Sequence, residues 1–264
     1  MNDLYSIIDN SILPQFLFYP QRRHSKPDGD AFDLIVEVDQ DVKIVCRAYP
    51  AANDAPWLLY FHGNGEVVSD YDDISRFYNS RGLNLFVADY RGYGASSGHP
   101  TFTAMVSDAG KILNYAGKEL KADGFSGSWL VMGRSMGSVS ALELASRSGD
   151  ELSGMIIESG FISVSKLIRH LGLPSPGNLK PIEDESFKIA ASINLPSLVI
   201  HGEHDRLVPL EQGRELYETI GSAQKELLII PHAEHNDIMF VDTDKYMDAI
   251  KNFCESVLNH NRGG

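Results

Sequence analysis

Six short apolar runs constrain the fold of this chain more than any other feature of its sequence. They cover residues 57–61, 83–88, 129–132, 155–157, 197–200 and 227–230. Nearly continuous apolar runs of this length are typical of strands that are covered on both faces, as in parallel sheets. Parallel strands require crossovers, and helical patterns occupy segments between and after the runs, at 68–80, 102–120, 135–146, 210–220 and 243–258. The sequence therefore predicts a doubly wound α/β sheet.

Two segments ahead of these runs alternate between apolar and polar residues. We expect residues 32–38 and 42–49 to form an antiparallel pair at one edge of the sheet, which brings the predicted, mostly parallel sheet to eight strands. The chain has 264 residues, and α/β architectures of this length are commonly built around one core. A single domain over residues 1–264, with helices on both faces of the sheet, is therefore the expectation.

One connection is too long for a simple crossover. Residues 160–195 separate two predicted strands, and their middle is interrupted by Pro174, Pro176, Gly177 and Pro181. This pattern favours a small cap or lid of two short helices around a Pro-rich turn. An ordinary elaborated loop is the alternative.

The charge of the chain disfavours several classes of partner. Its 36 acidic and 23 basic residues give a formal charge of −13, which repels phosphate backbones and anionic lipid surfaces. Nucleic acid is therefore not an expected partner. Cys46 and Cys254 lie far apart, without the spacing of a metal site or a disulfide framework, which favours a reducing, cytoplasmic location.

Membrane association is not expected either. No stretch approaches the ~20 apolar residues that a membrane-spanning helix needs, and the N-terminus lacks the basic residues of a secretory signal. Leu4, Ile7, Ile8 and Ile12 share one face of a predicted N-terminal helix. We expect this face to pack on its own domain rather than on a bilayer.

A candidate nucleophile follows the third apolar run. Residues 133–137, Gly-Arg-Ser-Met-Gly, match G-x-S-x-G between a predicted strand and a predicted helix, the setting in which a tight turn projects a serine hydroxyl. We therefore predict Ser135 as the nucleophile. Residues 94–98 match the same pattern, but they follow a loop and lead into His99 and Pro100. Ser96 is therefore predicted to be loop structure.

A serine nucleophile needs an imidazole to accept its proton and a carboxylate to orient that imidazole. His235 lies in the turn after the last predicted core strand, where it can reach Ser135, whereas His232 is closer to the strand and could cap it. Asp205 lies in the loop after the preceding strand, and Glu158 after residues 155–157 is its rival. We predict His235 as the base and Asp205 as the acid.

Two backbone amides are candidate donors to an acyl oxyanion. Asn64 lies in a glycine-rich turn, residues 62–65, after the first apolar run, and Met136 follows the predicted nucleophile. His62 and His201 each precede a glycine at a strand end. We expect both histidines to be structural rather than catalytic.

With these residues in place, the chain resembles the α/β-hydrolase superfamily, and in particular the small-lid group of serine aminopeptidase-like hydrolases and protein depalmitoylases. The resemblance rests on five features in the family's order, at residues 62–64, 89–94, 133–137, 201–209 and 235–236. It implies the α/β-hydrolase fold. It further implies transfer of an acyl group from an ester, thioester or amide to water through an acyl-serine intermediate, on a small-molecule or acylated substrate, with no metal and no organic cofactor.

Depalmitoylases of this group usually carry an N-terminal cysteine cluster for their own lipidation, and residues 1–45 contain no cysteine. A soluble carboxylesterase with a Ser135–His235–Asp205 triad is therefore the expected function. A peptidase that acts on short peptides is one alternative. A non-catalytic, ligand-binding member of the fold is another, although such proteins commonly lack a triad residue and none is lacking here.

Overall fold

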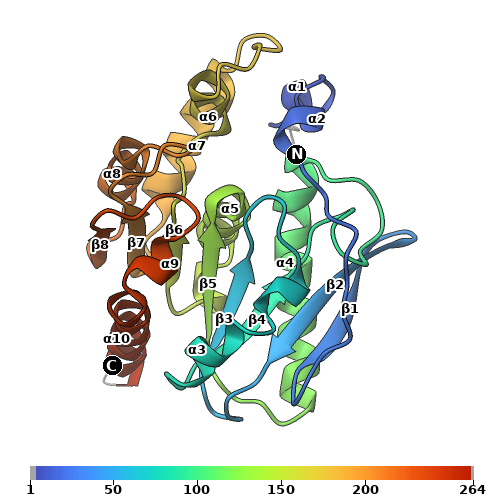
Figure 1. Ribbon diagram of the computed structural model, residues 1–264, viewed down its shortest axis with the longest axis vertical. Coiled ribbons are helices and arrows are strands. Elements are labelled where there is room, and N and C mark those ends of the chain that lie inside the picture. Colours follow the sequence, from blue (N-terminus) through green and yellow to red (C-terminus); the bar gives the residue numbers. More distant parts are fainter. Residues whose placement is uncertain (1–3, 263–264) are drawn as a thin grey trace.

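The computed structural model describes residues 4–262, which fold around one eight-stranded sheet (Figure 1). Its strands lie in the order β1-β2-β4-β3-β5-β6-β7-β8. Their bounds are β1 Phe32–Asp39, β2 Val42–Tyr49, β3 Trp57–Phe61, β4 Asn84–Ala88, β5 Trp129–Arg134, β6 Met155–Glu158, β7 Ser197–Gly202 and β8 Lys225–Ile230. The pairs β1–β2 and β2–β4 are antiparallel, and every other neighbouring pair is parallel. The predicted α/β sheet with its antiparallel edge is confirmed.

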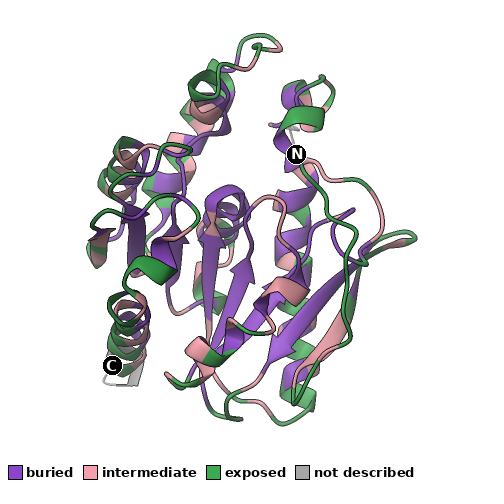
Figure 2. Ribbon diagram, in the orientation of Figure 1, coloured by how far each residue is buried: buried purple, intermediate pink, exposed green. Residues whose placement is uncertain are grey.

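Helices cover both faces of this sheet. The helices of the described residues are α1 Ser6–Asp9, α2 Pro14–Leu17, α3 Ser75–Asn79, α4 Phe102–Ala122, α5 Ser138–Arg147, α6 Val164–His170, α7 Lys180–Ser192, α8 Leu210–Thr219, α9 Ile238–Val241 and α10 Thr243–Arg262, with short 3-10 turns η1 Val68–Tyr71, η2 Ser135–Gly137 and η3 Gly149–Glu151. Side chains alternate along each strand. Leu59 and Phe61 therefore pack in a core with α4, α5, α7 and α8, whereas Leu58 and Tyr60 pack in a second core with α3 and α10. Figure 2 shows the resulting pattern, in which the central strands are buried and the helices expose their outer sides.

The start of the long helix α4 is stabilised by two side chains. Thr101 Oγ1 accepts a hydrogen bond from Ala104 N at 3.0 Å. The carboxylate of Asp9 accepts hydrogen bonds from Phe102 N at 2.9 Å and Thr103 N at 3.0 Å. A negative charge at this end of a helix also interacts favourably with the helix dipole. Asp9 thereby attaches α1 to the sheet domain.

The prediction of one continuous helix over residues 68–80 is wrong. The segment is divided into η1 and α3, because its aspartates bind groups outside a helix. Asp70 Oδ2 accepts a hydrogen bond from Val67 N at 3.0 Å, and Asp72 Oδ1 accepts one from Arg47 at 2.8 Å. The Ser75 hydroxyl also donates to Asp72 O at 3.0 Å, and such side-chain bonds to the backbone compete with regular helical pairing.

The prediction that one face of an N-terminal helix packs on the domain is also partly wrong. Ile8 is fully buried, but Ile7 and Ile12 expose 36% and 54% of their surface. The helical period stops at Ser11, whose hydroxyl donates to Ile8 O at 2.7 Å and accepts from Leu13 N at 3.0 Å. After this turn, α2 begins at Pro14, so the 3.6-residue period of one helix does not continue.

The long connection between β6 and β7 contains two helices, α6 and α7. Pro174, Pro176 and Gly177 lie between them, whereas Pro181 lies in the first turn of α7, a position that tolerates proline because no backbone donor is needed there. Figure 1 shows α6 and α7 extending beyond the carboxyl ends of the parallel strands, with α1 and α2 on the opposite side of α5. A lid function for residues 160–195 stays a prediction.

Candidate active site

Ser135 lies in the turn between β5 and α5, in a conformation that few residues adopt. Its φ is +51°, in the left-handed region that costs free energy for any residue with a side chain. The surrounding chain leaves no room at the neighbouring glycines. A Cβ on Gly133 would lie 2.6 Å from Gly137 O, and one on Gly137 would lie 2.0 Å from Phe61 O. The tight strand–turn–helix arrangement therefore requires both glycines of the motif.

The structure brings the three predicted triad residues together from three different loops. Ser135 Oγ lies 2.9 Å from His235 Nε2, and His235 Nδ1 lies 2.7 Å from Asp205 Oδ2. All three side chains are largely buried, with Ser135 and His235 exposing 8% and 6% of their residue surface. A continuous hydrogen-bonded path therefore runs from the hydroxyl to the carboxylate.

The environment of Asp205 favours its ionised form. Burial alone would raise the pKa of this carboxyl group, but the hydrogen bond and charge of His235 bring the pKa below its ordinary value. The other oxygen, Oδ1, accepts hydrogen bonds from Leu207 N at 3.0 Å and Val208 N at 2.8 Å. These bonds fix the carboxylate and support a negative charge on it.

The rivals for the triad positions lie elsewhere. The side chain of His232 is 82% exposed and lies near Glu203 rather than near Ser135. Glu158 Oε1 accepts from Arg134 Nε at 3.1 Å, and Glu158 Oε2 accepts from Tyr246 at 2.7 Å. The distances therefore favour His235 and Asp205 over both alternatives.

The side chain of Asn64 binds the N-terminal segment and Tyr93. Its Oδ1 accepts hydrogen bonds from Tyr19 N at 2.9 Å and from the Tyr93 hydroxyl at 2.6 Å, and its Nδ2 donates to Leu17 O at 2.8 Å. Among the described residues, the Asn64 backbone N–H has no acceptor. Met136 is in the first turn after β5, where helical N–H groups lack an intrahelical acceptor. The geometry is compatible with the two amides as oxyanion donors, which stays a prediction.

The other residues that the sequence pointed to have structural contacts. His62 Nδ1 donates to Gly63 O at 2.8 Å and its Nε2 lies 3.2 Å from Asp89, while His201 Nε2 donates to Val208 O at 2.8 Å. Burial lowers the pKa of His62, but the hydrogen bond and charge of Asp89 raise it above its ordinary value. Ser96 is buried, and its Oγ accepts from Val45 N at 2.9 Å. It attaches its loop to β2.

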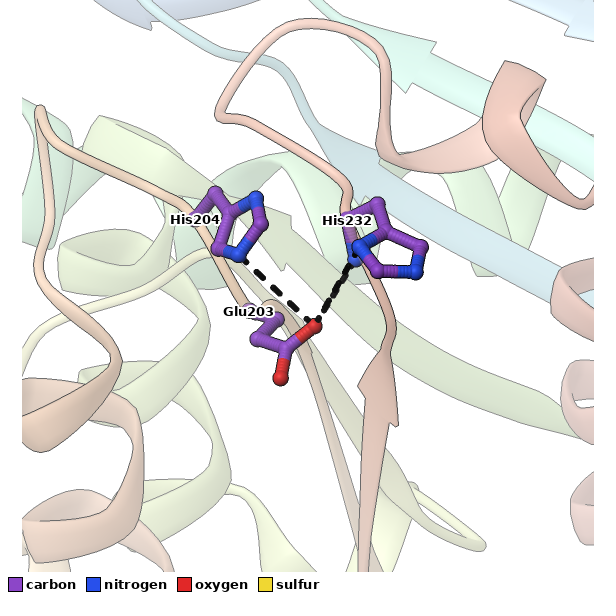
Figure 3. Close-up of side chains that lie close together, drawn as sticks. All are labelled: Glu203, His204 and His232. Atoms are coloured by element: carbon purple, nitrogen blue, oxygen red, sulfur yellow. Dashed lines mark hydrogen bonds and ion pairs between the residues drawn. The ribbon is translucent and has the colours of Figure 1, made fainter.

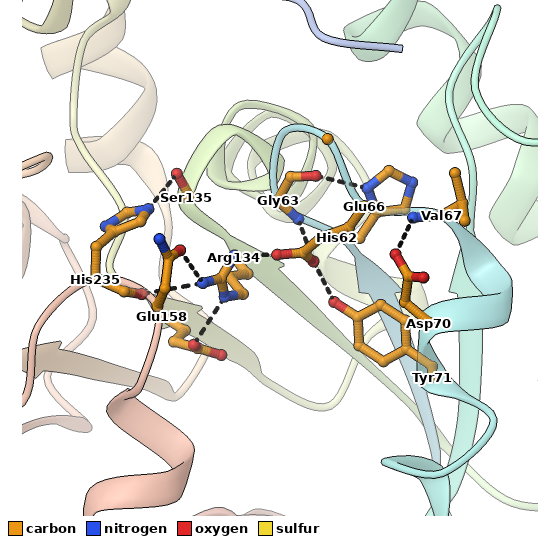
Figure 4. Close-up of polar contacts among 12 residues, drawn as sticks. His62, Gly63, Glu66, Val67, Asp70, Tyr71, Arg134, Ser135, Glu158 and His235 are labelled. Carbon is orange, nitrogen blue, oxygen red and sulfur yellow. Dashed lines mark hydrogen bonds and ion pairs between the residues drawn. The ribbon is translucent and has the colours of Figure 1, made fainter. Parts of the chain in front are cut away.

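One central residue of the site is not identified by the sequence reasoning. Arg134, directly before Ser135, pairs with Glu66 and donates from Nε to Glu158 Oε1 at 3.1 Å (Figure 4). It also donates to His235 O at 3.0 Å and to Asn236 Oδ1 at 3.1 Å. Burial opposes its charge, but the two carboxylates raise the pKa of Arg134 well above its ordinary value.

This guanidinium also reaches the loop of Asn64 through Glu66. Glu66 Oε2 accepts from Gly63 N at 3.0 Å and from the Tyr71 hydroxyl at 2.6 Å. Arg134 therefore connects three segments: the nucleophile turn, the His235 loop and the loop of Asn64. The signal in the sequence was an arginine at the end of a buried strand, with acids at 66 and 158 after the neighbouring strands, because a buried charge needs partners.

Comparisons with known proteins agree with this fold. The family described as "Serine aminopeptidase, S33" matches residues 54–181 and 183–244. The Saccharomyces cerevisiae protein named "Uncharacterized membrane protein YNL320W" is 32% identical over 95% of this chain and 89% of its own length. The uncharacterized protein YfhR of Escherichia coli K12 is 27% identical over 92% of this chain and 88% of its own.

A solved structure of similar fold is the Pyrococcus furiosus esterase Pf2001, at a TM-score of 0.73 and 20% identity, covering 91% of this chain and 97% of that chain. No helix within residues 4–262 combines the length and apolar character needed to cross a bilayer. The cytoplasmic location stays a prediction, since the yeast relative is called a membrane protein. The family match covers well over half of the sequence, and the eight-stranded sheet agrees with it. This chain belongs to the serine aminopeptidase S33 family of α/β-hydrolases.

Proposed function

We propose that the protein hydrolyses carboxylic esters or thioesters through an acyl-serine intermediate. The observation that carries this proposal is the path from Ser135 Oγ through His235 to Asp205, with contacts of 2.9 Å and 2.7 Å. The first is within the range in which a base can accept the proton of a nucleophile, and the second is within the range in which a carboxylate can orient that base. No metal or organic cofactor is needed for this chemistry.

The first half of the reaction transfers the acyl group to the enzyme. His235 Nδ1–H donates to Asp205, so Nε2 can accept the proton of Ser135 while Oγ bonds to the acyl carbon. The carbonyl oxygen becomes an oxyanion, which the N–H groups of Asn64 and Met136 stabilise. The bond to the alcohol or thiol leaving group then breaks, and the leaving group takes the proton from His235 Nε2.

The second half returns the enzyme to its starting state. His235 accepts a proton from water, and the resulting hydroxide oxygen bonds to the acyl carbon. The acyl–Oγ bond breaks, the carboxylic acid product leaves, and Ser135 regains its proton from His235. The charged imidazole is stabilised in both halves by the ionised Asp205, whose pKa lies below its ordinary value.

Labelling with a fluorophosphonate probe tests the nucleophile. We expect the probe to label the wild-type protein at Ser135 and to leave Ser135→Ala unlabelled. Ser96→Ala is the matched control, because it removes a buried serine from the second G-x-S-x-G match and should still be labelled. Labelling of Ser135→Ala at the wild-type rate would refute the proposal.

Peptide hydrolysis is the second candidate, favoured by the description of the matched family as a serine aminopeptidase. It uses the same triad but needs a site for the free amino group of a peptide. Turnover of a series of acyl esters of graded chain length, compared with aminoacyl anilides, distinguishes the two. We expect the esters to be hydrolysed faster, and the opposite order would favour the peptidase.

A further inference from the structure

Three side chains that the proposed reaction does not use converge close to the candidate active site. Glu203 and His204 lie in the loop after β7, and His232 lies in the loop after β8 (Figure 3). His204 directly precedes Asp205, and His232 is three residues before His235. Among the side chains that the structure describes, this is the group of histidine, cysteine and acidic residues whose spacing could hold a metal ion.

The distances in this group are close to those of a metal site. Glu203 Oε2 lies 3.9 Å from His204 Nε2 and 3.9 Å from His232 Nδ1, and the three candidate ligand atoms lie within 4.8 Å of one another. Zinc–ligand bonds of about 2.0–2.1 Å in a tetrahedral site place ligand atoms ~3.4 Å apart. Side-chain rotations that move each ligand atom by up to roughly 0.7 Å would therefore close the geometry.

Backbone hydrogen bonds already hold the two loops in register. Glu203 N donates to Ile230 O at 3.0 Å, and His204 N donates to Ala233 O at 2.9 Å. The backbone N–H of His232 donates to Glu203 Oε2 at 2.9 Å, and the φ of His232 is +62°. The carboxylate and the backbone that carries both imidazoles are thus held in place without an ion, which lowers the conformational entropy that binding would cost.

Exposure and charge also favour a cation here. The side chains of Glu203, His204 and His232 are 44%, 54% and 82% exposed, so a hydrated ion can reach them. Glu203 supplies a carboxylate, whose Oε2 accepts a hydrogen bond from the His232 N–H at 2.9 Å. Two imidazoles with one carboxylate suit zinc, copper or nickel, whereas calcium and magnesium prefer oxygen ligands alone.

We propose that Glu203, His204 and His232 bind one divalent transition-metal ion, with Zn²⁺ as the representative, and that water completes its coordination. The bound ion joins the loop that carries Asp205 to the loop that carries His235. It therefore stabilises the folded arrangement of both loops. This binding does not depend on the catalytic role of either residue, so the proposal stands or falls separately from the hydrolase function.

Calorimetric titration of the tag-free, full-length protein with Zn²⁺ tests the site, at neutral to slightly alkaline pH, because protons compete with metal ions for ligand atoms. We expect one ion per chain. His204→Ala, His232→Ala and Glu203→Gln should each weaken binding at least about tenfold, since even outer partners of metal ligands contribute 10- to 100-fold. Glu203→Gln keeps an oxygen that can accept the His232 N–H, so it separates loss of a ligand from loss of loop structure.

Two control variants keep the test specific. His99→Ala removes an exposed histidine from another loop and should leave the affinity unchanged. His235→Ala should also retain binding, because His235 is not one of the three proposed ligands. Loss of binding in this variant would instead place the ion at the candidate triad. The melting temperature should rise with Zn²⁺ in the wild type and not in the His204→Ala/His232→Ala double variant. Absence of saturable binding in the wild type, equal binding by the double variant, or loss of binding in His235→Ala would each overturn the proposal.

Discussion

Replacing Arg134 by glutamine should reduce activity by more than its effect on stability explains. Its side chain is 12% exposed, and the side chains of its partners Glu66 and Glu158 are 25% and 3% exposed. Removing one member of a buried ion pair leaves an uncompensated charge, which typically costs about 3–5 kcal/mol of unfolding free energy. We expect a loss in this range, because Glu158 has almost no access to water.

The effect on turnover has a separate cause. Arg134 donates to the backbone of His235 and, through Glu66, supports the Gly63 N–H beside Asn64. Without these bonds, the base and the candidate oxyanion donor are free to shift relative to Ser135. A displacement of about 1 Å costs on the order of 10²-fold in rate. We therefore expect kcat to fall about 100-fold in Arg134→Gln under conditions in which the variant is still folded.

Arg91 offers a matched control. It forms a similarly buried pair with Asp108, with contacts of 2.7 Å and 2.8 Å and side-chain exposures of 16% and 6%. This pair connects the loop after β4 to α4 and does not contact the candidate triad. Arg91→Gln should therefore lose comparable stability with little change in kcat for the folded fraction.

Denaturant unfolding and ester turnover, measured on both variants, provide the comparison. Arg134→Lys adds a further measurement, because lysine keeps the charge but cannot place donors on four acceptors at once. It should recover much of the stability and little of the turnover. Displacement of the base predicts that kcat of Arg134→Gln is ~10²-fold below that of Arg91→Gln. If the two kcat values instead agree within about twofold, Arg134 has no positioning role and the reasoning is wrong.

Three other perturbations address the triad, the pH dependence and the nucleophile turn. Asp205→Asn should lower turnover by up to ~10⁴ by stabilising the wrong imidazole tautomer; circular dichroism should show an intact fold, and near-normal turnover would return Glu158 as the acid. Burial alone would raise the pKa of Glu66, but the charge of Arg134 holds it below the ordinary value of 4.5, so the stability that it contributes is present above pH 4.5 and is lost as the pH falls through its folded pKa. In urea unfolding below that pH, Glu66→Gln should therefore lose stability less steeply than the wild type, by up to about 1.4 kcal/mol per pH unit, and parallel curves would contradict this. Gly137→Ala places a Cβ 2.0 Å from Phe61 O and should prevent folding or labelling by the probe, whereas Gly110→Ala in α4 meets no atom within 4 Å and should stabilise the protein by about 1 kcal/mol in the same unfolding assay.

The six core strands were predictable because each contains a short, nearly continuous apolar run, and the two strands at the sheet edge were predictable because apolar and polar residues alternate in them. The predicted run 129–132 lies within β5, and the residue after that strand is the serine of a motif whose glycines have a steric cause. The chain order and the strand ends were also enough to select His235 and Asp205, which the structure places in contact. Local patterns therefore suffice to predict the strands of a parallel sheet and the residues that follow their carboxyl ends.

The missed features depend on partners that are distant in sequence. The break between η1 and α3 follows from bonds between Asp72 and Arg47, which are 25 residues apart. Arg134 contacts Glu66 and Asn236, 68 and 102 residues away. A single sequence gives no pairing information for such contacts, so propensity alone predicted one helix and left the arginine without a role.

The side chain of Asn64 has a consequence for how this protein is made. Its partners Leu17 and Tyr93 are 47 and 29 residues away, on opposite sides of it along the chain. During synthesis, Leu17 and Tyr19 emerge before the turn that binds them, and the Asn64 side chain must wait for Tyr93. The turn that carries a candidate oxyanion donor is therefore complete only after Tyr93 has been made, so enzymatic turnover would report that Leu17 and Tyr19 have bound to it.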